Sequence, residues 1–258
     1  MISDFSRSFG DLCPTHSQVE SNRFGINVSR LNVPLESSSS DVEIAQICSN
    51  SPADLLILRY PSVRISLSQR LAELSKKYAF QADTLVYFSK NLDFKTEYYQ
   101  PVDGLKFSVA GAGDKLSIQS LSQEIFQDYP NHYRSNHHIE PRLILDGYVE
   151  WALSGLEDLT KLTVVVATPD SKMIGFALVS FDNDEAEIEL NGIHPDFQSR
   201  GVYSALIRMI MGRLADQKIK KLSISTQAQN TRVIRAWIKA GFNLDFSLNT
   251  FHLIARNS

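Results

Sequence analysis

Hydrophobic residues along this chain follow two different spacings, and the spacing changes several times. Segments 26–35, 54–61 and 82–89 are continuously apolar or alternate apolar with polar residues, which is typical of β-strands. Between the last two, apolar side chains recur at helical spacing, at Leu67, Leu71, Leu74 and Tyr78. Ser40 or Asp41 is suited to cap a short helix before the second strand. The first part of the chain therefore predicts an α/β unit.

A polar stretch with aromatic residues and no clear period, 91–104, separates this unit from the rest of the chain. It ends close to a proline and a glycine, which favour turns over regular elements. We therefore expect a small α/β N-terminal domain over 1–100 and a second domain over 105–258.

The second part contains more regular elements than the first. Helical periods predict helices at 114–129 and 141–156, with Asp114 as the cap of the first and Gly147 as a weak point in the second. Strand-like runs and turn residues predict the other elements, which are strands beginning near 105, 162, 174, 186, 221 and 247 and helices over about 201–217 and 230–241.

Composition restricts the class of protein. Hydrophobic residues make up 43% of the 258 residues, which is enough for a packed core. The formal net charge of −3 gives no electrostatic reason to expect nucleic acid as the main partner. The N-terminus lacks the pattern of a secretory signal, and the apolar runs are far too short to cross a membrane.

The number and spacing of the cysteines indicate the redox environment of the protein. Cys13 and Cys48 are the only two, and they lie far apart in the sequence. This usage predicts reduced thiols in the cytoplasm and neither a disulfide frame nor a zinc site. We expect a cytoplasmic protein with no membrane partner, and a homodimer is compatible with the sequence.

A lone glycine lies between a predicted strand and a predicted helix, in the run Gln198-Ser199-Arg200-Gly201-Val202-Tyr203. A helix start exposes unpaired N–H groups at the positive end of the helix dipole and binds phosphate well. The run is therefore either an anion cradle or an ordinary strand-to-helix junction. Neither the Rossmann nor the Walker spacing of glycines is present.

The run resembles the Q/R-x-x-G-x-G/A loop of the GNAT acetyltransferase superfamily. The surroundings agree, because Ile193-His194-Pro195 precedes the loop and "KLSIST", "QAQNT", "RVIRAWIKA" and Gly241-Phe242 follow it in the family's order. This resemblance covers about residues 105–258. It implies a mixed β-sheet flanked by helices, preceded here by the smaller α/β unit.

The resemblance implies acetyl-CoA as cosubstrate and no metal. In such a fold the backbone near Ile193 would bind the pantetheine arm in a gap between two strands. Backbone amides of Gln198, Ser199, Arg200, Gly201, Val202 and Tyr203 would hold the pyrophosphate. Asn230 matches an asparagine that contacts the cofactor, and it is also placed to cap a helix.

Within the superfamily, the chain looks most similar to the dTDP-fucosamine acetyltransferase type. The similar segments are "DLLILRYPSVRISLSQRLAELSKKYAFQADTLVYF" and "STQAQNTRVIRAWIKAGF". This likeness implies acetylation of the amine of a nucleotide-linked amino-deoxy sugar of the dTDP-4-amino-6-deoxyhexose type. The alternatives are an N-acetyltransferase for a peptide or small-metabolite amine and a non-catalytic sensor that binds acyl-CoA.

The sequence departs from the family pattern at two places. Tyr203 stands where the loop normally has Gly or Ala. Trp237 stands where the sugar acetyltransferases have a tyrosine, their general acid, and an indole N–H supplies no proton at neutral pH. Trp237 is then either a core residue or a hydrogen-bond donor to sulfur. Tyr203 and His252 are the alternative acids.

The acceptor amine must be neutral to attack, and a carboxylate can take up its proton directly or through water. In "AEIELNGI", strand alternation places Ile188 and Leu190 on one face and Glu187, Glu189 and Asn191 on the other. Glu189 is the catalytic candidate, and a solvated strand residue is the alternative. His132, His137 and His138 fall on the loop between the two predicted helices, without the further ligands that a metal site requires.

Overall fold

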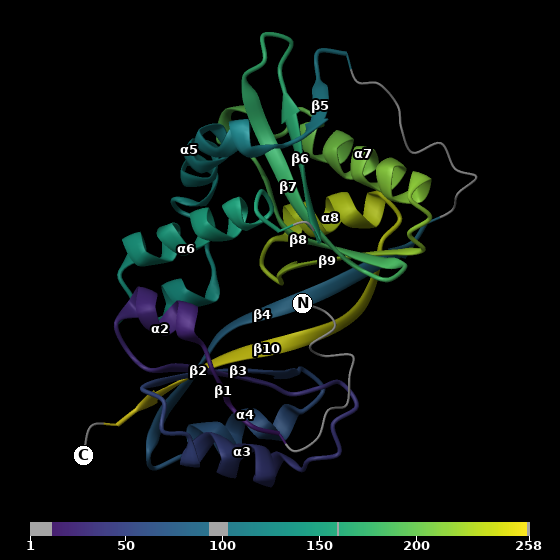
Figure 1. Cartoon of the computed structure of the whole chain (residues 1–258). Helices are drawn as coiled ribbons and strands as arrows, with labels where there is room; N and C mark the ends of the chain where they lie inside the picture. The colour runs from purple at the N-terminus through teal and green to yellow at the C-terminus, as the bar shows by residue number, and fades with distance from the viewer. Residues whose placement is uncertain (1–11, 93–102, 159, 257–258) are drawn as a thin grey trace.

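The computed structural model describes residues 12–92, 103–158 and 160–256. Within these residues ten strands form one β-sheet (Figure 1). They are β1 (Thr15–His16), β2 (Val28–Asn32), β3 (Leu55–Pro61), β4 (Lys77–Asn91), β5 (Lys106–Val109), β6 (Lys161–Ala167), β7 (Met173–Asp182), β8 (Glu185–Ile193), β9 (Lys221–Gln227) and β10 (Asn243–Ala255). Their spatial order is β1-β2-β3-β10-β4-β9-β8-β7-β6-β5.

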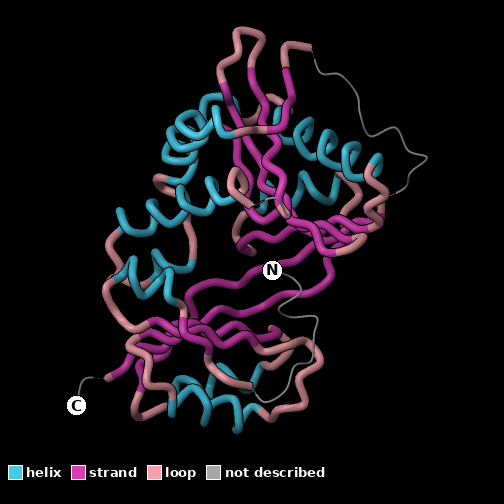
Figure 2. Tube along the Cα trace, viewed as in Figure 1, coloured by secondary structure: helices cyan, strands magenta, loops and turns pink. Residues whose placement is uncertain are grey.

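Helices lie outside this sheet, as Figure 2 shows. The described α-helices are α2 (Gln18–Phe24), α3 (Asp41–Asn50), α4 (Ile65–Ala72), α5 (Lys115–Phe126), α6 (Pro141–Ser154), α7 (Val202–Asp216) and α8 (Thr231–Lys239). Short 3₁₀ helices are η1 (Ala112–Asp114), η2 (His132–Ser135) and η3 (Pro195–Phe197). Ser40 caps α3 in a capping box with Glu43, which confirms one of the two predicted caps.

The sheet is mixed, as expected. Strands β2 and β3 pair in parallel, as do β8 and β9, and the other pairs are antiparallel. Two long strands, β4 and β10, join the lower and upper parts of the molecule (Figure 1). The last strand, β10, pairs with both β3 and β4, so segments 1–100 and 105–258 share one sheet. The division into two domains at residue 100 stays a prediction.

Three apolar clusters hold the layers together. In the lower part, α3 and α4 pack against one face of the sheet, through Ile44, Leu67 and Leu71. In the upper part, α7 and α8 cover one face and α5 and α6 cover the other. The described residues contain no helix that is long and apolar enough to cross a membrane.

Two local predictions were wrong. Tyr78 lies in β4 and is exposed, because α4 ends at Ala72 and a strand begins at Lys77. Asp114 precedes α5, but its carboxylate accepts from the Gly111 N–H and does not cap the helix.

Gly147 does not interrupt α6, which runs through it without a break. The reason for glycine is close approach: a Cβ at this position would lie 2.5 Å from the Arg23 guanidinium. Arg23 in turn donates to Glu150 at 2.5 Å, so this packing ties α2 to α6.

Strand β8 contains one extra residue relative to its neighbour β7. Leu190 pairs with Leu178 and Ile188 pairs with Val179, so Glu189 is the bulged residue. The bulge breaks the alternation: Ile188 packs with the α7 and α8 cluster, whereas Leu190 packs with the α5 and α6 cluster. The prediction that Ile188 and Leu190 share a face was therefore wrong.

Candidate active site

The two parallel strands β8 and β9 separate halfway along their length. They pair from Glu185 with Lys221 to Ile188 with Ile224, and the pairing ends where the bulge at Glu189 begins. Beyond this point β8 continues on β7, and β9 continues on β4. The facing backbone edges of the two strands are left open to a cleft of about 1580 Å³. This exceeds the ~300–1,000 Å³ of an ordinary small-molecule pocket.

The helix start predicted to bind an anion lies at the end of this opening. Gly201 precedes α7 with a φ of +79°, a left-handed conformation that strains residues with a Cβ. A Cβ at Gly201 would meet nothing within 4 Å, so backbone conformation and not crowding explains the glycine here. The first amides of α7 lack carbonyl partners within the helix. The loop thus presents donors beside the cleft.

Side chains hold the loop in this position. The Gln198 amide donates from Nε2 to the Ile193 carbonyl at 3.0 Å. Arg232, on α8, donates to Gln198 Oε1 at 3.2 Å and also to the Ser199 hydroxyl. Arg232 therefore connects the start of α8 to the loop before α7 and adds positive charge there.

Seven of the nine predicted site residues line this one cleft: Glu189, Ile193, Gln198, Ser199, Gly201, Tyr203 and Asn230. Arg200 is exposed, with its guanidinium 5.5 Å above the Phe197 ring. Val202 is buried in the core with only 5% exposed, so only its backbone is available to a ligand.

Asn230 occupies the residue before α8, but its side chain makes no cap to that helix. Its Nδ2 donates to the Thr226 hydroxyl at 3.0 Å. The Tyr129 hydroxyl lies 3.4 Å from the same Thr226 oxygen and donates to Gln227 at 2.5 Å. A polar chain of side chains therefore lines the β9 side of the opening.

Tyr203 and Trp237, the two residues that depart from the family pattern, contact each other. Trp237 Nε1 donates to the Tyr203 hydroxyl at 2.8 Å. Trp237 is only 1% exposed and packs edge-on against Phe88, so it is a core residue. Burial raises the pKa of Tyr203, and the hydrogen bond from Trp237 opposes that rise. The Tyr203 phenol is consequently protonated at neutral pH.

Glu189 is buried and has two donors on one oxygen. Its Oε2 accepts from Lys161 Nζ at 2.8 Å and from Trp151 Nε1 at 3.2 Å. The Glu189 side chain is only 6% exposed. A solvated strand residue, the alternative considered for Glu189, does not describe this environment.

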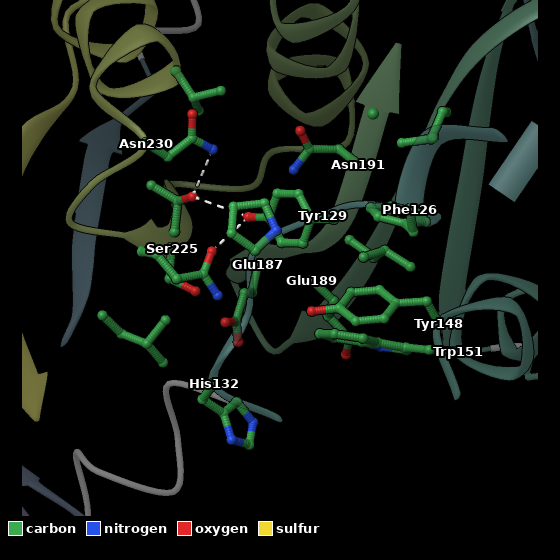
Figure 3. Close-up of a pocket in the computed structure, with 18 of the residues that line it drawn as sticks. Phe126, Tyr129, His132, Tyr148, Trp151, Glu187, Glu189, Asn191, Ser225 and Asn230 are labelled. Carbon is green, nitrogen blue, oxygen red and sulfur yellow. Dashed lines mark hydrogen bonds between the residues drawn. The ribbon is translucent and has the colours of Figure 1, made fainter. Parts of the chain in front are cut away.

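A neighbouring carboxylate faces the cleft more openly. Glu187 points into the pocket drawn in Figure 3, whereas Glu189 lies against Tyr148 and Trp151. Glu187 precedes the bulge and pairs with Ser180 of β7. The cleft thus contains two carboxylates on one strand.

Aromatic rings from α5, from the turn after α5 and from α6 form the wall of the cleft opposite β9. Phe126 stacks on Tyr148 at 4.8 Å, and Tyr148 lies 6.1 Å from Trp151. Burial raises the pKa of both Tyr129 and Tyr148. This wall combines apolar rings with neutral hydroxyls, and Trp151 of the wall contacts Glu189.

Of the three histidines on the predicted loop, only His132 is buried. Asn136 Nδ2 lies 3.4 Å from His252 Nδ1, and His252 Nε2 lies 2.8 Å from His132 Nδ1. The Asn136 amide donates, so the His252 proton is on Nε2 and points at His132. Burial lowers the pKa of His252 to about 3 and also lowers that of His132. His252 is therefore a neutral imidazole at neutral pH, and its remaining N–H is far too weakly acidic for it to serve as the general acid.

Known proteins resemble this chain in fold and in sequence. A GCN5-related N-acetyltransferase from Sphaerobacter thermophilus superposes on 90% of the chain and 74% of its own length, with a TM-score of 0.61 and 14% identity. Residues 119–242 match the family model described as Acetyltransferase (GNAT) family. This chain has the GNAT fold.

Two curated proteins share part of this GNAT region. Spore coat polysaccharide biosynthesis protein SpsD of Bacillus subtilis (strain 168) is 23% identical over 141 residues, 55% of this chain and 48% of SpsD. Ribosomal protein bS18-alanine N-acetyltransferase of Salmonella typhimurium is 30% identical over 76 residues, 30% of this chain and 51% of that enzyme. The chain thus matches about half the length of each relative.

Sequence reasoning missed several residues of the GNAT cleft. Arg232, Tyr129 and Trp151 carry no motif, and they come from helices and a turn distant in sequence from the loop. Glu187 was visible on the same strand face as Glu189, but the bulge that separates their environments has no sequence signature. Only packing brings this set together.

Proposed function

We propose that this protein is an acetyl-CoA-dependent N-acetyltransferase whose acceptor is the amine of a nucleotide-linked amino-deoxy sugar. One observation carries the proposal: the opening between β8 and β9 leads directly to the Gly201 turn at the start of α7. An extended chain fits between two strand edges, and an anion fits at a helix start. Pantetheine and pyrophosphate have this shape and charge.

The residues suited to each part of the cofactor follow from this geometry. Backbone groups around Ile193 would bind the arm, and amides from Gln198 to Tyr203 would hold the pyrophosphate. Arg232 would hold the loop and add charge, and Asn230 would contact the arm from the β9 side. Acetyl-CoA, when bound, supplies an acetyl thioester to the amine.

The amine must lose a proton before or during attack. Glu189 is the candidate from the sequence, and it can act through its second oxygen or a bridging water. The geometry favours Glu187, because its carboxylate points into the pocket, whereas the Glu189 side chain is only 6% exposed. We assign Glu187 as the proton acceptor and Glu189 as the residue that positions Lys161 and Trp151.

The departing thiolate needs a proton, and Tyr203 is the candidate acid. Its phenol holds a proton at neutral pH and lines the cleft. Trp237 positions the hydroxyl through the 2.8 Å hydrogen bond. The acid would thus come from α7, whereas in the sugar acetyltransferases it comes from the helix after the asparagine.

The nature of the acceptor rests on two supports. SpsD is named for polysaccharide biosynthesis. The cleft is also larger than one cofactor arm requires, and it continues past Glu187 to Arg30 and Arg59 in the lower part of the molecule. A peptide amine is the second candidate, because the chain also resembles the ribosomal protein bS18-alanine N-acetyltransferase.

Thiol release from acetyl-CoA tests the proposal directly. Purified protein is assayed with dTDP-amino-deoxy sugars, with peptides that begin in alanine, and with small amines. Release with the nucleotide sugars alone is the expected result. Fast release with peptides and none with nucleotide sugars would contradict it. Tight acetyl-CoA binding by calorimetry without turnover on any acceptor would instead indicate a sensor.

A further inference from the structure

The cleft has a second charged region, away from the loop before α7. This region lies at the lower part of the sheet. Arg30 and Arg59 line it together with His132 and Tyr133 of η2. Arg30 is already paired: it donates to Glu20 at 2.5 Å and 2.8 Å and to the Tyr133 hydroxyl at 2.8 Å. Among the described residues, the Arg59 guanidinium has no comparable hydrogen bonds.

The side chain of Arg59 has no hydrogen bond or ion pair with any residue in the described ranges, although its backbone pairs within the sheet. It lies on β3, opposite Thr250 of β10, which in turn lies opposite Asp83 of β4. These three side chains form one row across the cleft face of the sheet. The Nε of Arg59 is buried without a hydrogen-bond partner.

The one carboxylate in this row, Asp83, interacts with Arg59 through its charge. Burial raises the pKa of Asp83, although the Thr250 hydroxyl and the charge of Arg59 act against this rise. No ion pair joins Asp83 to Arg59 among the described residues. The nearby His132 and His252 are neutral, because burial lowers the pKa of each, and Arg59 contributes to this. A half-buried guanidinium without an ion-pair partner among the described residues is unfavourable, and a bound anion would offset that cost.

We propose that Arg59 forms an anion subsite that binds a phosphate of the acceptor's diphosphate, separate from the loop that faces the cofactor. This inference rests on the proposed nucleotide-sugar acceptor. A guanidinium offers a planar fork of donors that matches phosphate oxygens, and a half-buried site strengthens that contact. Arg59 lines the same cleft as Glu187 and Tyr203, so one ligand can extend from the subsite to the reacting groups.

Calorimetry with dTDP as the probe tests the subsite. Saturating acetyl-CoA is present throughout, so that dTDP cannot occupy the loop at Gly201. The comparison includes uncharged thymidine as a second probe. The variants are Arg59→Gln, Arg59→Lys and the matched control Arg70→Gln, which removes the same charge from an exposed position on α4.

We expect dTDP to bind the wild type and Arg70→Gln equally, and thymidine to bind far more weakly. Arg59→Gln should weaken dTDP binding about 10- to 100-fold, as for the loss of a hydrogen bond between charged groups. Arg59→Lys should weaken it several-fold, since ammonium lacks the fork. Equal binding of dTDP by wild type and Arg59→Gln overturns the inference. If the glutamine variant does not fold, wild-type affinity in Arg59→Lys overturns it.

The experiments can contradict the proposed subsite and the proposed acceptor independently of each other. Arg59-dependent dTDP binding without acetylation of any dTDP-amino sugar supports the subsite and contradicts the proposed acceptor. Acetylation of a dTDP-amino sugar with an unchanged acceptor KM in Arg59→Gln supports the proposed function and overturns the subsite. In both cases the KM for acetyl-CoA in Arg59→Gln should equal that of the wild type.

Discussion

Trp237 donates its indole N–H to the hydroxyl of Tyr203, across 2.8 Å between α8 and α7. Each residue alone is a departure from the family pattern, and together they form one unit. The indole fills the core and holds the phenol, while the phenol lines the cleft. The pair therefore links the packing of two helices to the chemistry proposed for the site.

Replacing Tyr203 tests whether this phenol is the acid. Tyr203→Phe keeps the ring and removes the proton donor, so kcat should fall by about 10²-fold while the KM for acetyl-CoA stays the same. The matched control Trp237→Phe keeps a core aromatic ring and should lower kcat far less. Steady-state kinetics of both variants measures kcat and the KM for acetyl-CoA. An unchanged kcat in Tyr203→Phe would exclude the phenol as the acid.

Glutamine variants distinguish the roles of the two carboxylates on β8. Glu187→Gln should lower kcat by about 10²- to 10⁴-fold at neutral pH, because the amine then has no proton acceptor. The loss should shrink as the pH rises, since the amine itself becomes neutral. Glu189→Gln should lower kcat less and show no such recovery. A pH profile of kcat for both variants measures this, and a reversed pattern would assign the base to Glu189.

Gly201→Ala tests the left-handed turn before α7. At a φ of +79° alanine costs roughly 1–2 kcal/mol, and the loop amides should shift. The KM for acetyl-CoA should rise several-fold, with little change in the acceptor KM. The control is Gly113→Ala, which also adds a methyl group into open space but has no positive φ. Equal effects of the two changes would show that the turn does not hold the cofactor.

The buried histidines predict how stability depends on pH. The pKa of His252 is about 3 in the folded protein and ~6.5 when unfolded, so below pH 6.5 the unfolded chain binds more protons. Stability from this residue is present above pH 6.5 and is lost as the pH falls. At pH 5 the loss is about 2 kcal/mol. Urea unfolding at pH 7.5 and pH 5 measures it.

The variant His252→Asn removes this titration. Its free energy of unfolding should change less between pH 7.5 and pH 5 than that of the wild type, even if its stability at pH 7.5 is lower. Carboxylates contribute little in this range, because their usual pKa values lie below it. An identical pH dependence in the variant and the wild type would contradict the assignment.

Periodicity and turn residues were sufficient for most elements of the fold. The strand at 186–193, the helix that begins after Gly201 and the helix that ends before Gly241 were all predicted close to their observed bounds. These elements have strong local patterns, and their order carried the resemblance to the GNAT superfamily. The same local patterns failed at Tyr78, where strand pairing with β10 overrides a helical stripe.

The chemistry of the site depends on contacts that no local pattern encodes. The sequence by itself determined the mixed α/β class, the loop at Gly201, and the presence of Tyr203 and Trp237. Only the tertiary structure decided that Tyr203 accepts from Trp237, that the bulge separates Glu187 from Glu189, and that the Nε of Arg59 is buried without a hydrogen-bond partner. Hydrophobic spacing is local, whereas burial, charge pairing and hydrogen bonding depend on residues brought together from distant parts of the chain.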